Sequence, residues 1–478
     1  MNTTIFFVCF SIYMALMVFI GWRVSRGQSG EDYLIGSRGI NVFLIIGTML
    51  ATQVGTGSSM GASGFGYTNG WAGLLYGVGG FASIVLVALL FADVRKYGFL
   101  TMSEEISFYY GANKYIKSIV SILIYIASVG WLGAHILGGS MYLSWVTGID
   151  LLAAKLITVL GFGIYVTIGG YLAVVWTDAI QSIILFVGFI VVAIMSIPEA
   201  GGFEAIRQAV PNDALSFLGI EKYGVIPAIS LLIAITVGGL AVPSFRHRIY
   251  SGKDVKSVKK GFLWTAGLYA IFAVFPVIIG MSAFTINPSL ENSSFAIPFM
   301  AMEVLPAGLG MLILIAGLSA TMSSGDSDAI AGVTILMTDI YSMVFGKMPD
   351  EDKMVRNSRI ATVLTLGIAF VMAAGATNIT NYIANMISTT LSGLAVASIM
   401  GKYWKRATWQ GGLAALIGGS ICSILATNSG ELMELLGDPT IPSLAGAFIA
   451  CVVVSLMTSE NKVSREEALR LIQENRKK

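Results

Sequence analysis

Stretches of about twenty mostly apolar residues recur along this chain from one end to the other. An α-helix needs about 20 such residues to cross the hydrocarbon core of a bilayer, where it satisfies its own backbone hydrogen bonds. Hydrophobic residues make up 55% of the 478 positions and charged residues only 12%, whereas a soluble domain carries about 25% charged residues. The sequence therefore predicts an all-α polytopic membrane protein, with the lipid bilayer as its surroundings.

Thirteen segments are long and apolar enough to be transmembrane helices. They are residues 4–23, 38–68, 72–93, 115–143, 150–168, 172–197, 224–245, 260–285, 297–344, 357–375, 380–400, 409–427 and 441–458. The second and ninth are long for a simple span, so we expect breaks or extensions in them. Loops rich in Lys and Arg follow the odd-numbered crossings, and such loops stay in the cytoplasm. This alternation predicts an N-terminus outside the cell, a cytoplasmic C-terminus and a place in the plasma membrane.

The net charge and the cysteines indicate which partners and cofactors are not expected. A formal net charge of +2, from 29 basic and 27 acidic residues, gives no reason to expect nucleic acid or an obligatory protein partner. Cys9, Cys422 and Cys451 lie in apolar segments at unrelated spacings, so neither a disulfide framework nor a thiolate metal site is expected. In the C-terminal tail, a capping-box pattern from Ser464 to Glu467 predicts a short solvated helix.

Two glycine-containing runs interrupt predicted spans. "ATQVGTGSSMGASGFGY" covers residues 51–67, and "TVGGLAVPSF" covers residues 236–245, five helices later. Repeated glycine, or a glycine pair followed by proline, should unwind a helix, and such a break is tolerated at bilayer depth only where it lines a cavity. Two broken helices at corresponding places in two five-helix units point to an inverted-repeat secondary transporter with its binding site near the midplane.

The segment "TMSSGDSD", residues 321–328, places hydroxyl groups inside an apolar span. Ala320, Ser323, Ser324 and Ser327 follow the spacing i, i+3, i+4 and i+7, which puts them on one face of a helix. Unwinding of residues 51–56 would leave backbone carbonyls there without their usual partners. Hydroxyl and carbonyl oxygens together would suit a hard monovalent cation.

Three aspartates in apolar segments also need partners. A carboxylate at the bilayer centre costs about 2.5–3.5 kcal/mol on insertion scales. Asp326 lies one turn beyond Ser323 and is expected near the ion route. Asp328 points roughly 160° away from Asp326, given about 100° per residue, and is expected to pair with a basic group. Asp178, in "GGYLAVVWTDAIQ", requires a partner as well.

Four motifs resemble the sodium:solute symporter family, in the family's order. They are "EDYLIGSRG" at 31–39, "GGYLAVVWTDAIQ" at 169–181, "RHRIYSGKD" at 246–254 and "MSSGDSDAIAGVTILMTDIY" at 322–341, and the resemblance extends to about residue 405. It implies a bacterial member with a leucine-transporter-type 5+5 inverted-repeat core, one extra helix before it and two after. It also implies sodium entry coupled to solute uptake by alternating access, so the chain is expected to be a transporter and not an enzyme.

The resemblance also divides the chain. It implies an N-terminal helix and cytoplasmic loop (1–37), a first repeat (38–197), an extracellular loop (198–223), a second repeat (224–405), two additional helices (406–458) and a cytoplasmic tail (459–478).

Residue by residue, the resemblance implies two sodium sites. The main site would use the backbone carbonyls of Ala51, Val54 and Ala320 and the hydroxyls of Ser323 and Ser324. A second site, present in some members, would use Asp178, Ser323, Asp326 and Ser327. Other members carry serine where this chain has Asp326, which leaves proton coupling by the same fold as an alternative.

For the solute pocket we expect seven residues from both breaks and from the helix spanning 115–143. They are Gln53, Ser58, Ser59, Trp131, His135, Val242 and Phe245. The "MSSxDS" form is most like that of high-affinity choline transporters, but Gln53 and Val242 stand where those members have aromatics, so choline is not expected. No Lys or Arg belongs to this set, which favours a small neutral, zwitterionic or cationic solute, such as an amino acid or amine.

Arg246, His247 and Arg248 carry other expectations. The two arginines are assigned to the cytoplasmic basic pattern and an intracellular gate, and His247 to the membrane interface.

Proteins of other functional classes fit the sequence less well. No P-loop pattern supports a primary pump. An intramembrane aspartyl protease would need a Gly-x-Gly-Asp motif, whose first glycine is Ser323 here. A channel would explain neither the breaks nor the motifs.

Overall fold

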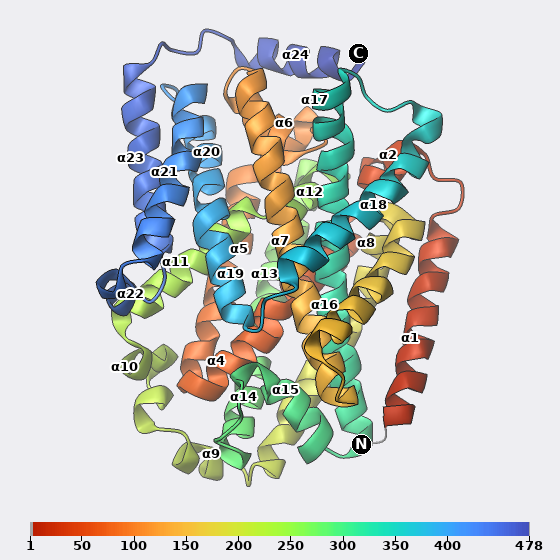
Figure 1. The fold of residues 1–478 in the computed structure, drawn as a ribbon, viewed down its shortest axis with the longest axis vertical. Coiled ribbons are helices and arrows are strands. Elements are labelled where there is room, and N and C mark those ends of the chain that lie inside the picture. Colours follow the sequence, from red (N-terminus) through yellow and green to blue (C-terminus); the bar gives the residue numbers. More distant parts are fainter. Residues whose placement is uncertain (1–2, 478) are drawn as a thin grey trace.

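The computed structural model describes residues 3–477, and within that range every named element is a helix. In Figure 1 the long helices run along the long axis, α1 begins at the lower end and α24 lies across the upper end. The helices are α1 (Thr3–Val24), α2 (Gly30–Ile35), α3 (Val42–Gln53), α4 (Ala62–Asn69), α5 (Leu74–Phe91), α6 (Met102–Tyr109), α7 (Lys114–Thr147), α8 (Leu151–Glu199), α9 (Phe203–Ala209), α10 (Ile220–Tyr223), α11 (Val225–Ala241), α12 (Pro243–Ser251), α13 (Val255–Phe272), α14 (Val274–Ile286), α15 (Ala296–Phe299), α16 (Ala307–Ile335), α17 (Tyr341–Phe345), α18 (Glu351–Ala373), α19 (Ile379–Met386), α20 (Ser392–Tyr403), α21 (Trp409–Thr427), α22 (Gly430–Leu436), α23 (Thr440–Met457) and α24 (Arg465–Lys477).

The length and apolar composition of the helices show which of them could cross a membrane. Among residues 3–477, nine helices are long and apolar enough to cross a membrane, or up to ten if one bent pair forms a single span. Shorter apolar helices such as Val42–Gln53 fall below that length. All-helical, multi-span architecture is therefore confirmed, whereas the count of thirteen and the inverted repeat stay predictions.

Both expected breaks are present. α3 ends at Gln53, Val54 has non-helical angles (φ −83°, ψ 57°), and helical structure resumes as a wide turn over Gly57–Gly61 before α4. The second break is sharper, because α11 and α12 meet at Val242 with a bend of 43°. Pro243 is the first residue of α12, where its missing N–H leaves no helix bond unmade.

A third break separates the predicted spans 150–168 and 172–197, which are both parts of α8. Gly170 has φ 60° and ψ −162°, a conformation that L-residues with a Cβ rarely adopt. A Cβ at this position would also lie 2.7 Å from the ring of Tyr33. Glycine is thus required here by both backbone conformation and space.

α16 forms the centre of the molecule. It packs against α7, α8 and α3, and its residues from Ala316 to Ile335 are all buried. The polar segment 321–328 consequently has no access to lipid. Its hydroxyl and carboxylate groups find their partners within α16 itself and on the neighbouring helices, including α12.

The C-terminal helix α24 is less solvated than expected. Its N-terminus is capped by the Ser464 hydroxyl, which accepts the Glu467 backbone N–H at 3.1 Å. However, Ala468 and Ile472 are buried, and Arg476 donates through Nε to Glu104 of α6 at 2.8 Å. The predicted short helix is present but only partly solvated, because one face of α24 packs on α6.

Removal of the Arg476 side chain should release this helix. Burial favours neutral Glu104, but Arg476 opposes it and holds the pKa of that carboxyl below its usual range. We expect Arg476→Ala to increase proteolytic cleavage of the tail on the order of tenfold, since a hydrogen bond to a charged group contributes about 1.5–3 kcal/mol. Arg470→Ala on the exposed face is the matched control, and equal cleavage of both variants would contradict the docking.

The same contact predicts a pH dependence. Glu104 faces Lys117 as well as Arg476, and Arg476 also faces Asp339 and Glu31. A depressed carboxyl pKa stabilises the docked helix fully above the unfolded value of about 4.3, and that contribution is lost as the pH falls through the lower folded pKa. Tail cleavage in the unmodified chain should therefore increase only in acid, below about pH 4.

Candidate functional site

The first break exposes the carbonyl ends of α3 to the serine pair of α16. The last carbonyls of any helix lack intrahelical partners, and here α3 stops within the protein interior. Ser323 Oγ lies 3.1 Å from the Ala51 carbonyl oxygen and 3.2 Å from that of Ala320. Ser324 Oγ lies 3.0 Å from the Thr52 carbonyl oxygen and 3.1 Å from that of Ala320. All these groups are buried.

This cluster offers oxygen atoms without a fixed charge. Each hydroxyl has a single proton and two lone pairs, so it can donate to only one carbonyl at a time. Its oxygen lone pairs remain free, and they could coordinate a bound cation. Within the described chain no group of three His, Cys, Asp or Glu side chains could hold a metal ion. Neutral hydroxyl and carbonyl ligands suit a hard alkali cation better than a transition metal.

The structure brings together four of the five residues predicted for the main sodium site. Ala51, Ala320, Ser323 and Ser324 share the contacts above, and Val54 is the buried, non-helical residue that follows α3. Thr52 was not predicted, although its carbonyl lies close to Ser324. The role of these residues as sodium ligands stays a prediction.

The second predicted site contains a guanidinium group. Arg248 donates through Nη2 to Asp178 at 3.2 Å and to Ser327 Oγ at 2.5 Å. The same nitrogen donates to Thr48 at 2.8 Å and to Thr52. Asp178 also accepts from the Thr48 hydroxyl at 2.5 Å. The partner that Asp178 requires is thus a built-in cation, placed where a second sodium ion was expected.

Asp326 and Ser323 contribute to this second cluster unequally. Asp326 accepts a hydrogen bond from Tyr165 at 2.6 Å and one from Ser327 at 3.4 Å. Ser323 instead contacts the main cluster through Ala51 and Ala320. A second sodium at Asp178, Ser323, Asp326 and Ser327 stays a prediction for a state in which Arg248 has moved away.

The Arg-His-Arg segment is buried, unlike the interfacial position expected for His247. The side chains of Arg246, His247 and Arg248 are at most 3% exposed. His247 packs against Tyr171, with ring centroids 4.4 Å apart. Arg246 donates to Glu105 of α6 at 2.7 Å, where Tyr250 donates too. The 43° bend turns α12 into the protein interior, which the basic sequence alone did not indicate.

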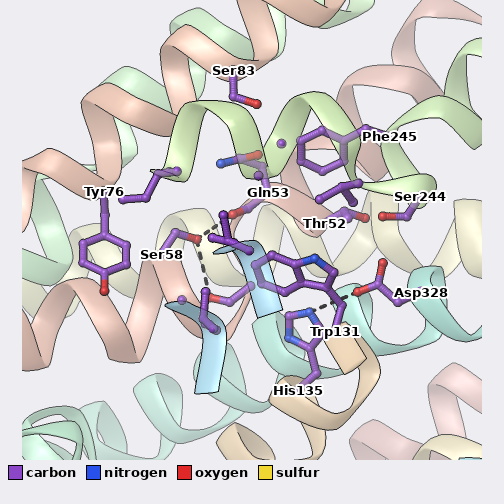
Figure 2. Close-up of a pocket in the computed structure, with 18 of the residues that line it drawn as sticks. Thr52, Gln53, Ser58, Tyr76, Ser83, Trp131, His135, Ser244, Phe245 and Asp328 are labelled. Atoms are coloured by element: carbon purple, nitrogen blue, oxygen red, sulfur yellow. Dashed lines mark hydrogen bonds and ion pairs between the residues drawn. The ribbon is translucent and has the colours of Figure 1, made fainter. Parts of the chain in front are cut away.

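A cavity lies between the two breaks. Its volume is about 90 Å³, and Figure 2 shows side chains from several helices converging on it. Six of the seven residues predicted for the solute line it, and they are Gln53, Ser58, Trp131, His135, Val242 and Phe245. Ser59 does not; it is buried, and its hydroxyl donates to the Gly55 carbonyl at 2.7 Å.

Several lining residues were missed from the sequence. Tyr76 and Ser83 come from α5, Tyr269 from α13 and Asp328 from α16. The first three carry no motif, because a lone Tyr or Ser in an apolar helix is usually a packing residue. Asp328 does have the basic partner expected of it, since its Oδ2 lies 3.3 Å from His135 Nε2.

Gly55 lets the ion cluster and the cavity approach each other. A Cβ at this position would lie 2.6 Å from Ser324 Oγ and 2.8 Å from the His135 ring. We expect Gly55→Ala to separate α3 from α16 and to weaken sodium-dependent solute binding about tenfold or more, at a structural cost of about 1–3 kcal/mol. Gly267→Ala in α13, where nothing lies within 4 Å, is the control, and unchanged binding by Gly55→Ala would contradict this geometry.

Sequence comparisons find related transport proteins over nearly the whole chain. The model of the sodium:solute symporter family matches residues 33–419. A sodium/pantothenate symporter of Haemophilus influenzae is 25% identical and covers 94% of this chain and 94% of its own length. A sodium/glucose cotransporter of Vibrio parahaemolyticus is 26% identical, over 95% of this chain and 90% of its own.

Structural comparison shows the same fold in a known transporter. A substrate-bound, outward-open Na⁺-coupled sialic acid symporter superimposes with a TM-score of 0.80 at 20% identity, covering 96% of this chain and 99% of the other. The nucleobase-cation symporter Mhp1 in a closed conformation gives a TM-score of 0.60 at 14% identity, over 93% and 98% of the two chains. The relatives and neighbours have different solutes, so similarity alone does not identify the solute of this chain.

Proposed function

Since this chain belongs to the sodium:solute symporter family, we propose that it carries a small polar organic solute into the cell together with sodium. The matched relatives are transporters and not enzymes. The solute would be neutral, zwitterionic or cationic, such as an amino acid or an amine, because no Lys or Arg is among the described residues that line the cavity. The protein would act in the plasma membrane by alternating access, with its N-terminus outside.

The observation that carries this proposal is that the ion cluster and the cavity share one break. Thr52 lines the cavity, while its carbonyl and that of the preceding Ala51 face Ser324 and Ser323. A sodium ion held by these oxygens would fix the end of α3 against α16 and thereby shape the cavity wall. Solute and sodium would then favour the same occluded state, which is the thermodynamic meaning of coupling.

Energy for uptake would come from the sodium gradient and the membrane potential. Each charge that enters contributes about 2.3 kcal/mol per 100 mV. Sodium is therefore cargo as well as a ligand that organises the cavity. In the proton-coupled alternative, a proton carried by Asp326 would be the coupling ion. The sodium symporters among the relatives do not favour this alternative.

A ligand screen on the purified protein tests the proposal. Thermal unfolding would be followed with amino acids, amines, sugars and short carboxylates, in sodium chloride and in potassium chloride at equal ionic strength. We expect at least one solute to stabilise the protein in sodium only, and counterflow of that labelled solute in liposomes to show a carrier. Solute stabilisation that is equal in both salts would contradict sodium coupling.

A further inference from the structure

One oxygen of Asp328 is buried in the cavity wall without a hydrogen-bond partner. The Asp328 side chain is 3% exposed and lines the cavity. Its Oδ2 contacts His135, but among the described residues Oδ1 has no partner. Buried polar atoms are almost always hydrogen-bonded, and an unpaired charged one is costly. A hydrogen-bond donor that enters the cavity would complete the hydrogen bonding of Oδ1.

His135 is a partner for only one of the two carboxylate oxygens of Asp328. Thr56 Oγ1 lies 3.0 Å from His135 Nδ1, and Asp328 Oδ2 lies 3.3 Å from Nε2. In a neutral imidazole one nitrogen donates and the other accepts. A neutral ring thus donates from Nε2 to the carboxylate and accepts the Thr56 hydroxyl proton at Nδ1. This arrangement satisfies both imidazole nitrogens and the Thr56 hydroxyl, and it supplies no donor to Asp328 Oδ1.

The buried arginines of α12 form ion pairs with carboxylates other than Asp328. No Lys or Arg is among the described residues that line the cavity. Arg246 is paired with Glu105, and Arg248 with Asp178, in fully buried contacts. A carboxylate in such a low-dielectric site attracts a positive charge strongly. Asp328 therefore lines the cavity without a Lys or Arg partner among the described residues.

Trp131 is a second cavity residue with an unpaired polar group. Within the described part of the chain the indole N–H of Trp131 is buried and has no acceptor. Its ring lies over His135, with centroids 6.3 Å apart, so Trp131 and Asp328 both contact the same imidazole. Figure 2 shows the three side chains grouped on one wall of the cavity. Donor and acceptor sites for one small molecule are thus close together.

We propose that the transported solute carries a protonated primary or secondary amine, which donates N–H to Asp328 Oδ1, and an acceptor atom bound by the Trp131 indole. This rests on the proposed symport function of the same cavity and narrows its solute class. A sugar or a simple carboxylic acid lacks the positive charge. A quaternary ammonium has the charge but no N–H to donate.

Matched ligand pairs test this chemistry on the unmodified chain. The probes are L-alanine against lactate, L-proline against tetrahydrofuran-2-carboxylate, and ethanolamine against both ethylene glycol and choline. In sodium chloride, we expect at least one amine to stabilise the protein at concentrations about tenfold below those of its counterpart. The proposal is overturned if no amine is preferred, or if choline equals or surpasses ethanolamine.

Two conservative variants assign the contacts. Asp328→Asn should weaken binding of the preferred amine about tenfold or more, while sodium alone still stabilises the protein. Trp131→Phe keeps an aromatic ring at this position but removes the indole N–H together with the pyrrole part of the side chain, and it should weaken binding less than Asp328→Asn does. Unaltered amine affinity in Asp328→Asn would overturn the assignment. If sodium does not stabilise the unmodified chain, the proposed symport function is contradicted. A failure of the amine assignment can thus be told apart from a failure of the proposed function.

Discussion

Replacement of both Ser323 and Ser324 by alanine is expected to raise the sodium concentration needed for solute uptake on the order of a hundredfold or more. Each hydroxyl would be a direct ligand of the ion, and an interaction with a charged group contributes about 1.5–3 kcal/mol. Two such losses amount to about 3–6 kcal/mol, and each 1.4 kcal/mol is tenfold in affinity. Ser323→Ala alone should give an intermediate effect. The measurement is sodium-activated uptake in liposomes.

A control on the same helix separates ligand loss from misfolding. The Thr321 hydroxyl donates to the Leu318 carbonyl of its own helix at 3.0 Å and does not contact α3. Thr321→Val removes that hydroxyl at nearly constant shape, and it should leave sodium activation within about threefold of the unmodified chain. If the serine variants and Thr321→Val shift sodium activation equally, the serine pair does not bind the ion.

Arg248→Ala is expected to lower stability by about 3–5 kcal/mol in sodium-free buffer, because loss of one partner leaves a buried charge uncompensated. The stranded group would be Asp178, which is fully buried. Sodium should recover part of this loss, since the departure of the guanidinium would free the oxygens of Asp178 and Ser327 for a second ion. Thermal unfolding in sodium chloride and in N-methylglucamine chloride measures both effects.

The double variant Arg248→Ala with Asp178→Asn is the matched comparison. It removes the stranded carboxylate together with its cation, so its stability should be partly restored and its response to sodium should fall to that of the unmodified chain. A sodium-induced shift of Arg248→Ala no larger than that of the unmodified chain would mean that Arg248 does not occupy an ion site. In that case the second cluster would be structural only.

Local chemistry made the two breaks and the serine face predictable. A proline at position 243 and glycines around position 55 act on the backbone within a few residues, and helical spacing alone puts Ser323 and Ser324 together. Family resemblance added Ala51 and Val54, whose carbonyls carry no side-chain signal of their own.

The pairing of distant charged groups was not predictable in the same way. Arg248 follows a basic pattern that is typical of a cytoplasmic loop, and only the bend at Val242 carries it to Asp178. Asp328 was expected to have a basic partner, but His135 could be identified only once α7 and α16 were seen to pack together. The tyrosines of the cavity lie in helices whose apolar sequence does not mark the face turned inward.

Equilibrium binding of radioactive sodium to the purified protein tests the central claim most directly. The account predicts one sodium ion bound per unmodified chain, because the Ala51 and Ala320 carbonyls with the two serine hydroxyls form one site and Arg248 fills the other. It predicts that the Ser323→Ala, Ser324→Ala double variant binds sodium on the order of a hundredfold more weakly or worse. Sodium binding by that variant with unchanged stoichiometry and affinity would contradict the account.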